Sequence, residues 1–255
     1  MTPRTLAIIP ARYASTRLEG KPLRRLGSRS IIEWVYRRVS EAVTDVVVAT
    51  DDERIYSAVE DFGGRAVMTS TEHRSGTDRC AEALMKVGGQ YDIIINVQGD
   101  EPFIRREQID ALIECFADAD VTIATLAHPF DAEEGMAAVE NPNAVKVVRD
   151  SHGRALYFSR SVIPYVRDAE RGEWLRRHRY LRHVGIYAFR PATLLEVTNL
   201  GASELEERER LEQLRWLEGG YRIGVAVTPY ASIGIDTPED LARAEELIAT
   251  YGDEI

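Results

Sequence analysis

The chain has 255 residues, of which 44% are hydrophobic and 29% charged, and its formal net charge is −10 at pH 7. This length and apolar content can form one large domain, or a domain with a subdomain, and they exclude a disordered chain. No apolar run approaches the ~20 residues that a membrane helix needs, no signal peptide is evident, and Cys80 and Cys115 form no CxxC pair. We therefore expect a cytoplasmic protein with reduced thiols, whose acidic balance argues against nucleic-acid partners and which has no membrane partner.

The first part of the chain alternates strands and helices. Five short β-branched runs with little polar alternation are typical of strands buried on both faces, and they read LAIIP, DVVVAT, RAVMTS, YDIIINVQG and VTIATLA. A capping box over residues 30–33 opens a helix with Ile31, Val35 and Val39 on its apolar face. Residues 50–53 open a second helix, which the glycine pair at 63–64 ends. A third helix carries the apolar residues Ile109, Leu112, Ile113 and Phe116. This order predicts a Rossmann-like, three-layer α/β fold with a mostly parallel central sheet.

The pattern changes from about Val139. The runs AVKVVRD, ALYFSRS and HVGIYAF are typical of strands with few helical residues between them, and charged loops join them. We predict antiparallel strands that form a subdomain for substrate binding or dimerisation over about 139–200. No linker divides the chain, so this subdomain is expected to be inserted in a single domain covering 1–255.

A basic loop follows the first strand. The strand ends near Pro10, and the loop from there to Lys21 also carries Arg12 and Arg17. Ligands of open α/β sheets bind beyond the carboxyl ends of strands, where arginine and lysine can meet phosphate oxygens. The loop matches neither the Walker A pattern nor the GxGxxG fingerprint. From the residues alone, two alternatives therefore remain, a solvated basic loop and a phosphate-binding site.

Seven blocks along the chain resemble one family. They read IPARYASTRLEGKPL, HRSGTDR, NVQGDEP, YFSRSVIPY, RHVGIYAFR, LEQLR and GIDTPEDL. In this order they resemble the sugar-activating cytidylyltransferases, most closely those that act on 3-deoxy-manno-octulosonate (Kdo), and they span nearly the whole chain. Glu19 departs from the family's usual proline. The resemblance implies a nucleotidyltransferase fold, a homodimer, and the conversion of CTP and Kdo to CMP-Kdo and pyrophosphate, which supplies lipopolysaccharide biosynthesis.

The resemblance also assigns the nucleotide half of the site. Phosphoryl transfer needs positioning and charge neutralisation, which Arg12 and Lys21 would provide on the triphosphate, with Arg17 a weaker candidate. Asp100 and Asp236 follow separate strands, and two such carboxylates can hold Mg²⁺, the expected cofactor. The catalytic residues predicted are Lys21, Arg12, Asp100 and Asp236, and the nucleotide-binding residues are Pro10, Ala11, Arg12, Lys21, Ser75, Gly76, Arg79 and Gln98.

Structural roles compete with these assignments. Asp100 could be a turn residue and Asp236 a helix cap, although Thr237 fits that cap better. His73 lies at a helix start capped by residues 75–78, where a structural role competes evenly with a functional one.

The sugar half draws on later blocks. The resemblance assigns sugar contacts to Gln98, Arg160, His183, Tyr187, Glu212 and Gln213. Arg160 is the expected partner of the sugar carboxylate. His183 and Tyr187 are four apart on a strand and should face the same side. A capping box at Ser203 predicts one helix with Leu211, Leu214 and Leu217 on its apolar face and residues 212–213 at its polar edge. Without the resemblance, these two would be a solvated helix face.

Other functions stay open at this point. A cytidylyltransferase for sialic acid or for an amino-substituted Kdo would carry similar blocks. A nucleotide-sugar glycosyltransferase also uses a metal-binding aspartate after a strand, and a non-catalytic nucleotide-binding module is a third alternative. Pyrophosphate release from CTP and a free acid sugar separates these classes.

Overall fold

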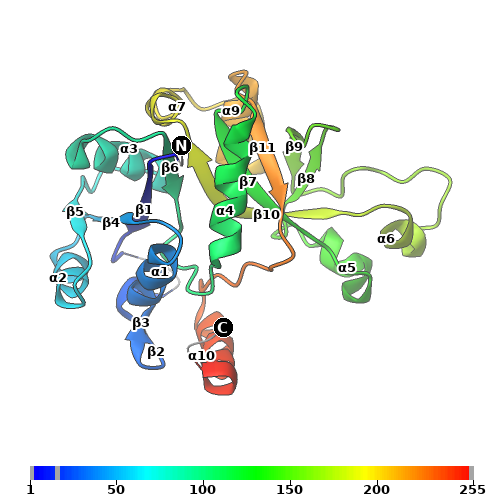
Figure 1. The fold of residues 1–255 in the computed structure, drawn as a ribbon. Helices are drawn as coiled ribbons and strands as arrows, with labels where there is room; N and C mark the ends of the chain where they lie inside the picture. Colours follow the sequence, from blue (N-terminus) through cyan, green and yellow to red (C-terminus); the bar gives the residue numbers. More distant parts are fainter. Residues whose placement is uncertain (1–2, 15–17, 253–255) are drawn as a thin grey trace. The chain divides into compact units, whose positions relative to one another are not determined.

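The computed structural model describes residues 3–14 and 18–252, in two compact units (Figure 1). The first unit comprises residues 1–110, 190–198 and 232–255, and the second comprises 111–189 and 199–231. The predicted subdomain of 139–200 falls in the second unit except for 190–198. No helix of the described residues is long and apolar enough to cross a membrane.

The first unit is built on parallel strands. Their order is β5-β4-β1-β6, and β1 pairs in parallel with both β4 and β6, as β4 does with β5. The strands are β1 (Thr5–Ala11), β4 (Asp45–Thr50), β5 (Ala66–Met68) and β6 (Ile93–Asn96). Every residue of β6 is buried, as are all but the first of β4. The predicted parallel sheet is confirmed.

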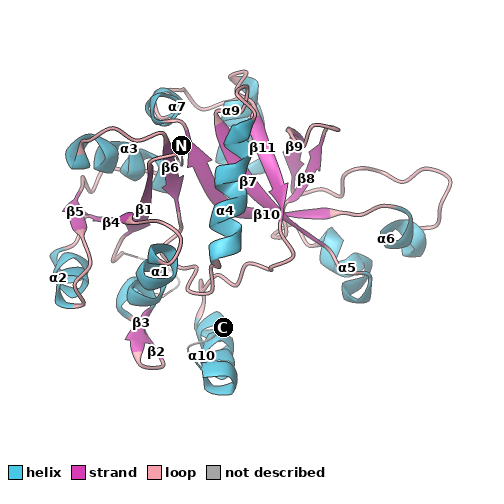
Figure 2. Cartoon of the chain, in the orientation of Figure 1, coloured by secondary structure: helices cyan, strands magenta, loops and turns pink. Residues whose placement is uncertain are grey.

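Helices join these strands and cover the sheet (Figure 2). The connecting helices are α1 (Ile31–Ser40), α2 (Glu53–Asp61) and α3 (Gly76–Val87), and α7 (Pro191–Val197) and α10 (Pro238–Tyr251) come from later in the chain. α1 and α2 each connect neighbouring strands in the same direction along the sheet, whereas α3 leads back from β5 to β6. Because such crossovers are right-handed, α3 lies on the face opposite to α1 and α2.

The helix starts follow the local sequence. The Ser30 side chain accepts a hydrogen bond from the Glu33 amide at the start of α1, and Ser75 and Asp78 form a capping box at the start of α3. The second helix begins within the predicted opening segment of residues 50–53. Asp52 caps α2 by accepting from the Arg54 amide, while Thr50 stays in the last position of β4.

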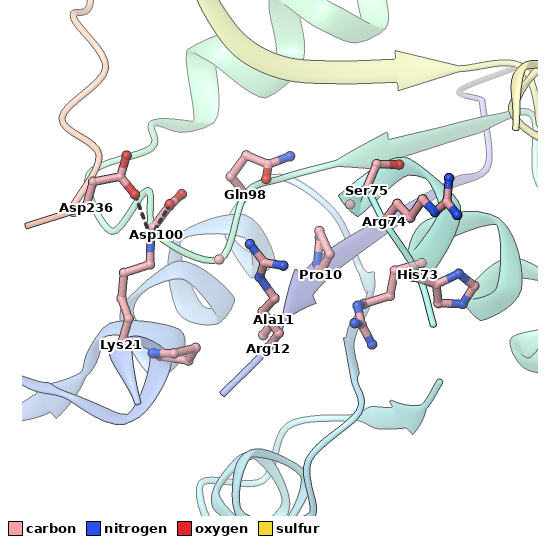
Figure 3. A pocket seen from close by; sticks show the side chains of 14 residues that line it. Pro10, Ala11, Arg12, Lys21, His73, Arg74, Ser75, Gln98, Asp100 and Asp236 are labelled. Carbon is pink, nitrogen blue, oxygen red and sulfur yellow. Dashed lines mark hydrogen bonds and ion pairs between the residues drawn. The ribbon is translucent and has the colours of Figure 1, made fainter. Parts of the chain in front are cut away.

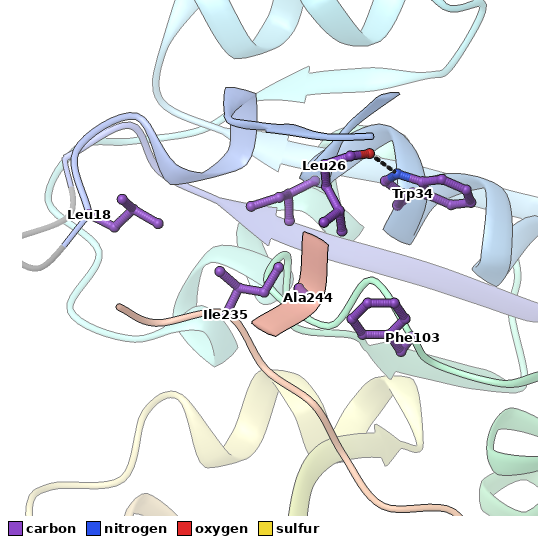
Figure 4. Close-up of a cluster of buried hydrophobic side chains, with 7 residues drawn as sticks. Leu18, Leu26, Trp34, Phe103, Ile235 and Ala244 are labelled. Carbon is purple, nitrogen blue, oxygen red and sulfur yellow. Dashed lines mark hydrogen bonds between the residues drawn. The ribbon is translucent and has the colours of Figure 1, made fainter. Parts of the chain in front are cut away.

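A buried cluster ties the basic loop to the end of the chain (Figure 4). It joins Leu18 and Leu26 to Phe103, Ile235 and residues of α1 and α10. The Trp34 indole N–H donates to the Leu26 carbonyl at 2.8 Å. Leu18 lies three residues before Lys21, Phe103 lies three after Asp100, and Ile235 directly precedes Asp236. This cluster therefore positions three of the predicted site residues.

The second unit contains mostly antiparallel strands in the order β11-β7-β10, with β8 beside β10 and β9 beside β8. β10 is antiparallel to β8, and β8 is antiparallel to β9, as predicted. β10 is also antiparallel to β7, which was not predicted, because the run VTIATLA was assigned to the parallel strands. β11, which is parallel to β7, was not expected from the sequence. The strands are β7 (Ile123–Pro129), β8 (Lys146–Arg149), β9 (Ala155–Ser159), β10 (Leu181–Phe189) and β11 (Ile223–Val227).

The helix predicted after Ser203 is two helices. The capping box at Ser203 opens α8 (Glu204–Glu209), and α9 (Glu212–Glu218) begins after a break. Arg210 adopts a left-handed conformation with φ of 53°, which ends α8. The Glu209 carboxylate accepts hydrogen bonds from the Ser159 hydroxyl and the Arg160 amide. The last residue of α8, just before the break, is therefore bonded to the carboxyl end of β9. The remaining helices are α4 (Arg106–Glu114), where the two units divide, α5 (Gly135–Glu140) and α6 (Trp174–Arg177).

Candidate active site

A pocket of about 240 Å³ lies in the first unit, at the carboxyl ends of β1 and β6 and the start of α3 (Figure 3). All eight predicted nucleotide-binding residues line it, together with both predicted metal ligands. The full lining is Pro10, Ala11, Arg12, Lys21, Pro22, His73, Arg74, Ser75, Gly76, Arg79, Gln98, Gly99, Asp100 and Asp236. Four lysine and arginine side chains face two aspartates here, so the pocket is cationic within a chain of net charge −10. Such a site favours an anionic ligand.

Two glycines allow the close backbone approach that forms the pocket. Gly20 has a φ of +65°, and a Cβ there would lie 3.0 Å from the Tyr13 ring. A Cβ on Gly99 would lie 2.9 Å from the Pro10 carbonyl oxygen. Larger residues at these positions would push the loop before Lys21, or the turn before Asp100, away from the end of β1.

Lys21 bridges the two predicted metal ligands. Its Nζ lies 2.6 Å from Asp100 Oδ2 and 2.9 Å from Asp236 Oδ1, and Figure 3 shows the three side chains meeting at one end of the pocket. Burial acts to lower the pKa of Lys21, but the two carboxylates outweigh it and hold that pKa above its usual value. The lysine is therefore charged, and one cation reaches both carboxylates.

Backbone contacts bring these carboxylates together. The Ile235 amide donates to the Asp100 carbonyl at 2.9 Å, which joins the segment before α10 to the turn after β6. Thr237 caps α10 in a capping box with Asp240. Asp236 is therefore not the helix cap, and its carboxylate is directed to Lys21 instead.

The donor set fits a magnesium ion that a nucleotide completes. Among residues 3–14 and 18–252, no group of three or more His, Cys, Asp or Glu side chains could hold a metal by itself. Mg²⁺ is usually bound through one or two carboxylates, waters and substrate phosphates. Asp100 and Asp236 could supply the protein's share of such a coordination, and the basic side chains around them would attract the phosphates.

The other end of the pocket is formed by the start of α3. Ser75 and Gly76 lie at this helix terminus, where backbone N–H groups favour an anion. Arg79 is only 4% exposed, and its guanidinium donates to Asp51 and to Thr69, each at 2.6 Å. This contact fixes the shape of the pocket wall. His73 Nε2 pairs with the Glu82 carboxylate, which agrees with a structural role.

Two polar side chains of the pocket differ in their contacts. Gln98 donates from Nε2 to Asn96 Oδ1 at 3.1 Å, which leaves its carbonyl oxygen as an acceptor. Arg12 is exposed and makes no hydrogen bond or ion pair with another described residue. Arg17 lies outside the described residues.

The sugar-binding candidates other than Gln98 lie in the second unit. The rings of His183 and Tyr187 are 5.4 Å apart, which confirms that they share a face. Gln213 is 5% exposed, which excludes the alternative that it lies on a solvated helix face. α9 begins only after the break at Arg210, and this turns Gln213 inward.

Three buried polar atoms of this cluster make no hydrogen bond of normal geometry with another described residue. They are the Tyr187 hydroxyl, Gln213 Nε2 and Trp216 Nε1. The ring of Tyr187 packs edge-on against Trp216 at 4.9 Å. Burial, with the charge of Glu212, raises the pKa of Tyr187 well above its usual value, so the hydroxyl keeps its proton. Since buried polar groups are normally paired, these atoms indicate a polar ligand.

Arg160 is held by backbone carbonyls. Its Nε donates to Glu209 O at 2.6 Å, Nη1 to Pro142 O at 2.9 Å and Nη2 to Arg210 O at 3.4 Å. A guanidinium has five N–H groups, so two remain for a ligand. The buried Lys146 ammonium also donates to the Arg160 carbonyl at 2.6 Å. Arg160 is thus an oriented cation, and among the described residues its side chain makes no hydrogen bond with His183.

Sequence reasoning missed Thr125, Glu209 and Arg74. Thr125 lies on β7 within hydrogen-bond distance of His183 Nε2, at 3.0 Å, and nothing local in the run VTIATLA marks it. Glu209 organises Arg160 from 49 residues away. Arg74 lines the pocket, and its place in the block HRSGTDR was the available signal.

A parallel α/β sheet with a cationic pocket at its carboxyl edge and two facing aspartates defines a nucleotide-binding enzyme of the nucleotidyltransferase class. The profile of the family described as Cytidylyltransferase matches residues 6–223. The chain belongs to the cytidylyltransferase family.

The chain matches relatives over nearly their full length. The chain is 54% identical over 243 residues to a 3-deoxy-manno-octulosonate cytidylyltransferase of Bacteroides thetaiotaomicron, covering 95% of this chain and 97% of the relative. It is also 54% identical to the protein of that name from Phocaeicola vulgatus, covering 95% and 96%. A solved structure of CMP:2-keto-3-deoxy-manno-octonic acid synthetase complexed with CTP is 42% identical, with a TM-score of 0.88, covering 97% of this chain and 99% of that one.

Proposed function

We propose that this protein transfers CMP from CTP to Kdo, releasing pyrophosphate and forming CMP-Kdo. The observation that carries the proposal is the Lys21–Asp100–Asp236 cluster inside a cationic pocket at the carboxyl edge of a parallel sheet. Full-length relatives at 54% identity carry the name of this activity, and a structure at 42% identity was solved with CTP.

The reaction is an in-line displacement at phosphorus. The anomeric hydroxyl of Kdo attacks the α-phosphorus of CTP, and its oxygen forms the new P–O bond. The hydroxyl proton is released to water, and the bond to the pyrophosphate leaving group breaks. Arg12 and Lys21 neutralise phosphate charge, and the amides at the start of α3 can bind phosphate oxygens. Asp100 and Asp236 would hold Mg²⁺, which supplies further charge neutralisation when bound. Arg79 orients the pocket wall through Asp51.

The second unit supplies the proposed sugar contacts. Arg160 offers two free N–H groups to the sugar carboxylate, and this fork suits a planar anion. The unpaired Tyr187 hydroxyl and Gln213 amide suit the hydroxyl groups of a sugar. Glu212 and Gln98 complete the proposed set. The homodimer and the role in lipopolysaccharide biosynthesis belong to the same proposal, and their support is the likeness to relatives of that name.

A pyrophosphate-release screen tests this function. Purified protein with Mg²⁺ is mixed with each of the four nucleoside triphosphates and with Kdo, amino-substituted Kdo or sialic acid. We expect release only with CTP, and fastest with Kdo. Faster release with sialic acid or the amino sugar would change the assigned substrate. No release with any acid sugar would refute the transferase function.

A further inference from the structure

Thr125 contacts both the backbone and the histidine of the sugar cluster. It lies on β7, is fully buried, and is the register partner of Tyr187 on β10. Its Oγ1 lies 3.1 Å from Val184 O, 2.9 Å from Ile186 O and 3.0 Å from His183 Nε2. One hydroxyl therefore has three hydrogen-bonding neighbours, and the Tyr187 hydroxyl also interacts with it, which acts to lower the pKa of Tyr187 against the larger effect of burial.

The hydrogen count determines the direction of these bonds. A hydroxyl has one proton, and a carbonyl oxygen can only accept. If that proton pointed to His183, the Thr125 oxygen would face two carbonyl oxygens with no proton between them, which is repulsive. The hydroxyl therefore donates to the carbonyls of Val184 and Ile186, and its lone pair accepts from His183. His183 must then carry its proton on Nε2.

The other ring nitrogen is left as an acceptor. Burial lowers the pKa of His183 to about 3, so the ring is neutral and has one N–H. With Nε2 protonated, Nδ1 has a lone pair, and it makes no hydrogen bond with another described residue. A neutral acceptor suits a hydroxyl donor and not a carboxylate.

A bulge in β10 produces this arrangement. The register of β10 against β7 shifts between Val184 and Tyr187, so two residues have no partner there. Inserting two residues preserves the alternation of faces, and it brings His183 and Tyr187 to partners only two apart on β7. Thr125 bonds the two carbonyls at this bulge and contacts His183 with the same oxygen.

We propose that Thr125 is a positioning residue, which holds His183 in the Nε2–H form so that Nδ1 accepts a hydrogen bond from a hydroxyl of the sugar acid. The inference rests on the proposed function, because it takes this cluster as the sugar site. The ligand group it specifies is an uncharged O–H donor, in contrast to the anion that Arg160 would bind.

The test combines Thr125→Val with Thr125→Ser. Valine keeps the shape and removes the hydroxyl, whereas serine retains it. Histidine ¹⁵N–¹H correlation spectra report the tautomer directly, and the chain has only five histidines to assign. We expect the Nε2–H form of His183 in the wild type and the serine variant, and its loss or mixing in the valine variant. Thr193→Val, at another buried threonine, is the matched control for burying an extra methyl group.

Kinetics with pyrophosphate release supply the second measurement. Thr125→Val should raise the KM for Kdo about 3- to 10-fold, as expected for one hydrogen bond, with the KM for CTP unchanged. Thr125→Ser should restore it. An Nδ1–H tautomer in the wild type, or an unchanged KM for Kdo in a folded Thr125→Val variant, would overturn the inference. If the wild type released no pyrophosphate with any sugar, the proposed function would fail instead, and the spectra would still decide the tautomer.

Discussion

Replacing Lys21 with methionine should strengthen divalent-cation binding at Asp100 and Asp236 when no nucleotide is present. The ammonium lies 2.6 and 2.9 Å from these carboxylates, so an ion that uses the same oxygens must displace it. Methionine keeps an unbranched apolar side chain of similar length and removes the competing charge. The variant should also lose turnover, because the triphosphate loses a neutralising group.

The size of the effect follows from the exposure of the bridge. The Lys21 and Asp100 side chains are 14% and 25% exposed, and Asp236 is 45% exposed. An exposed ion pair contributes about 0–1 kcal/mol, and breaking a buried pair costs about 3–5 kcal/mol. This bridge lies between these limits, at about 1–3 kcal/mol, which corresponds to roughly 5- to 150-fold in metal affinity.

The free Mn²⁺ signal in electron paramagnetic resonance measures that affinity without any turnover. Lys86→Met is the matched control, because it removes the same charge from an exposed lysine of the first unit that does not line the pocket. The Lys21→Met variant should bind Mn²⁺ more tightly than the wild type and the control. Equal affinity in Lys21→Met and Lys86→Met, with unchanged melting temperatures, would refute the reasoning.

Three further outcomes are expected. Two amide substitutions, Asp100→Asn and Asp236→Asn, should each cut turnover roughly 100-fold or more with little change in melting temperature. The double variant should lose less turnover than the product of the two single losses. Near-normal turnover at saturating Mg²⁺ would show that these aspartates are not metal ligands. Arg160→Ala should raise the KM for Kdo more than 10-fold, while CTP binding measured without sugar stays constant. Arg160→Lys should restore the KM for Kdo only partly. An equal loss of CTP binding in Arg160→Ala would place Arg160 in the nucleotide half of the site. Glu206→Gln should cost about 1–3 kcal/mol at pH 7, since the hydrogen bond from Arg215 lowers the pKa of Glu206 below its ordinary 4.5. The ionised Glu206 carboxylate stabilises the fold at pH values above its ordinary pKa of 4.5. The difference in unfolding free energy between the wild type and Glu206→Gln should therefore shrink as the pH falls below about 4.5. A difference that does not change with pH would contradict this prediction.

Much of the first unit could be predicted from sequence, because its signals are local. Four of the five β-branched runs form the parallel strands of this unit, and the capping residues at Ser30, Ser75 and Thr237 start helices as expected. Most of the nucleotide-binding candidates lie in segments that follow these strands, whose carboxyl ends meet at one edge of a parallel sheet, whereas Asp236 lies just before α10. All the nucleotide-binding candidates therefore line one pocket.

Contacts between residues far apart in the chain needed the tertiary structure. Lys21 meets carboxylates 79 and 215 positions away, and no local pattern indicates that one ammonium bridges both. Thr125 contacts His183, which lies 58 positions further along the chain, beside a bulge in β10. Nothing in the run HVGIYAF predicts that bulge. Strand propensity and helix capping are properties of neighbouring residues, and the sequence by itself determined those. Which polar groups share a buried site, which nitrogen of His183 carries the proton, and which carboxylates one lysine can reach depend on packing between distant segments, and only the tertiary structure decided them.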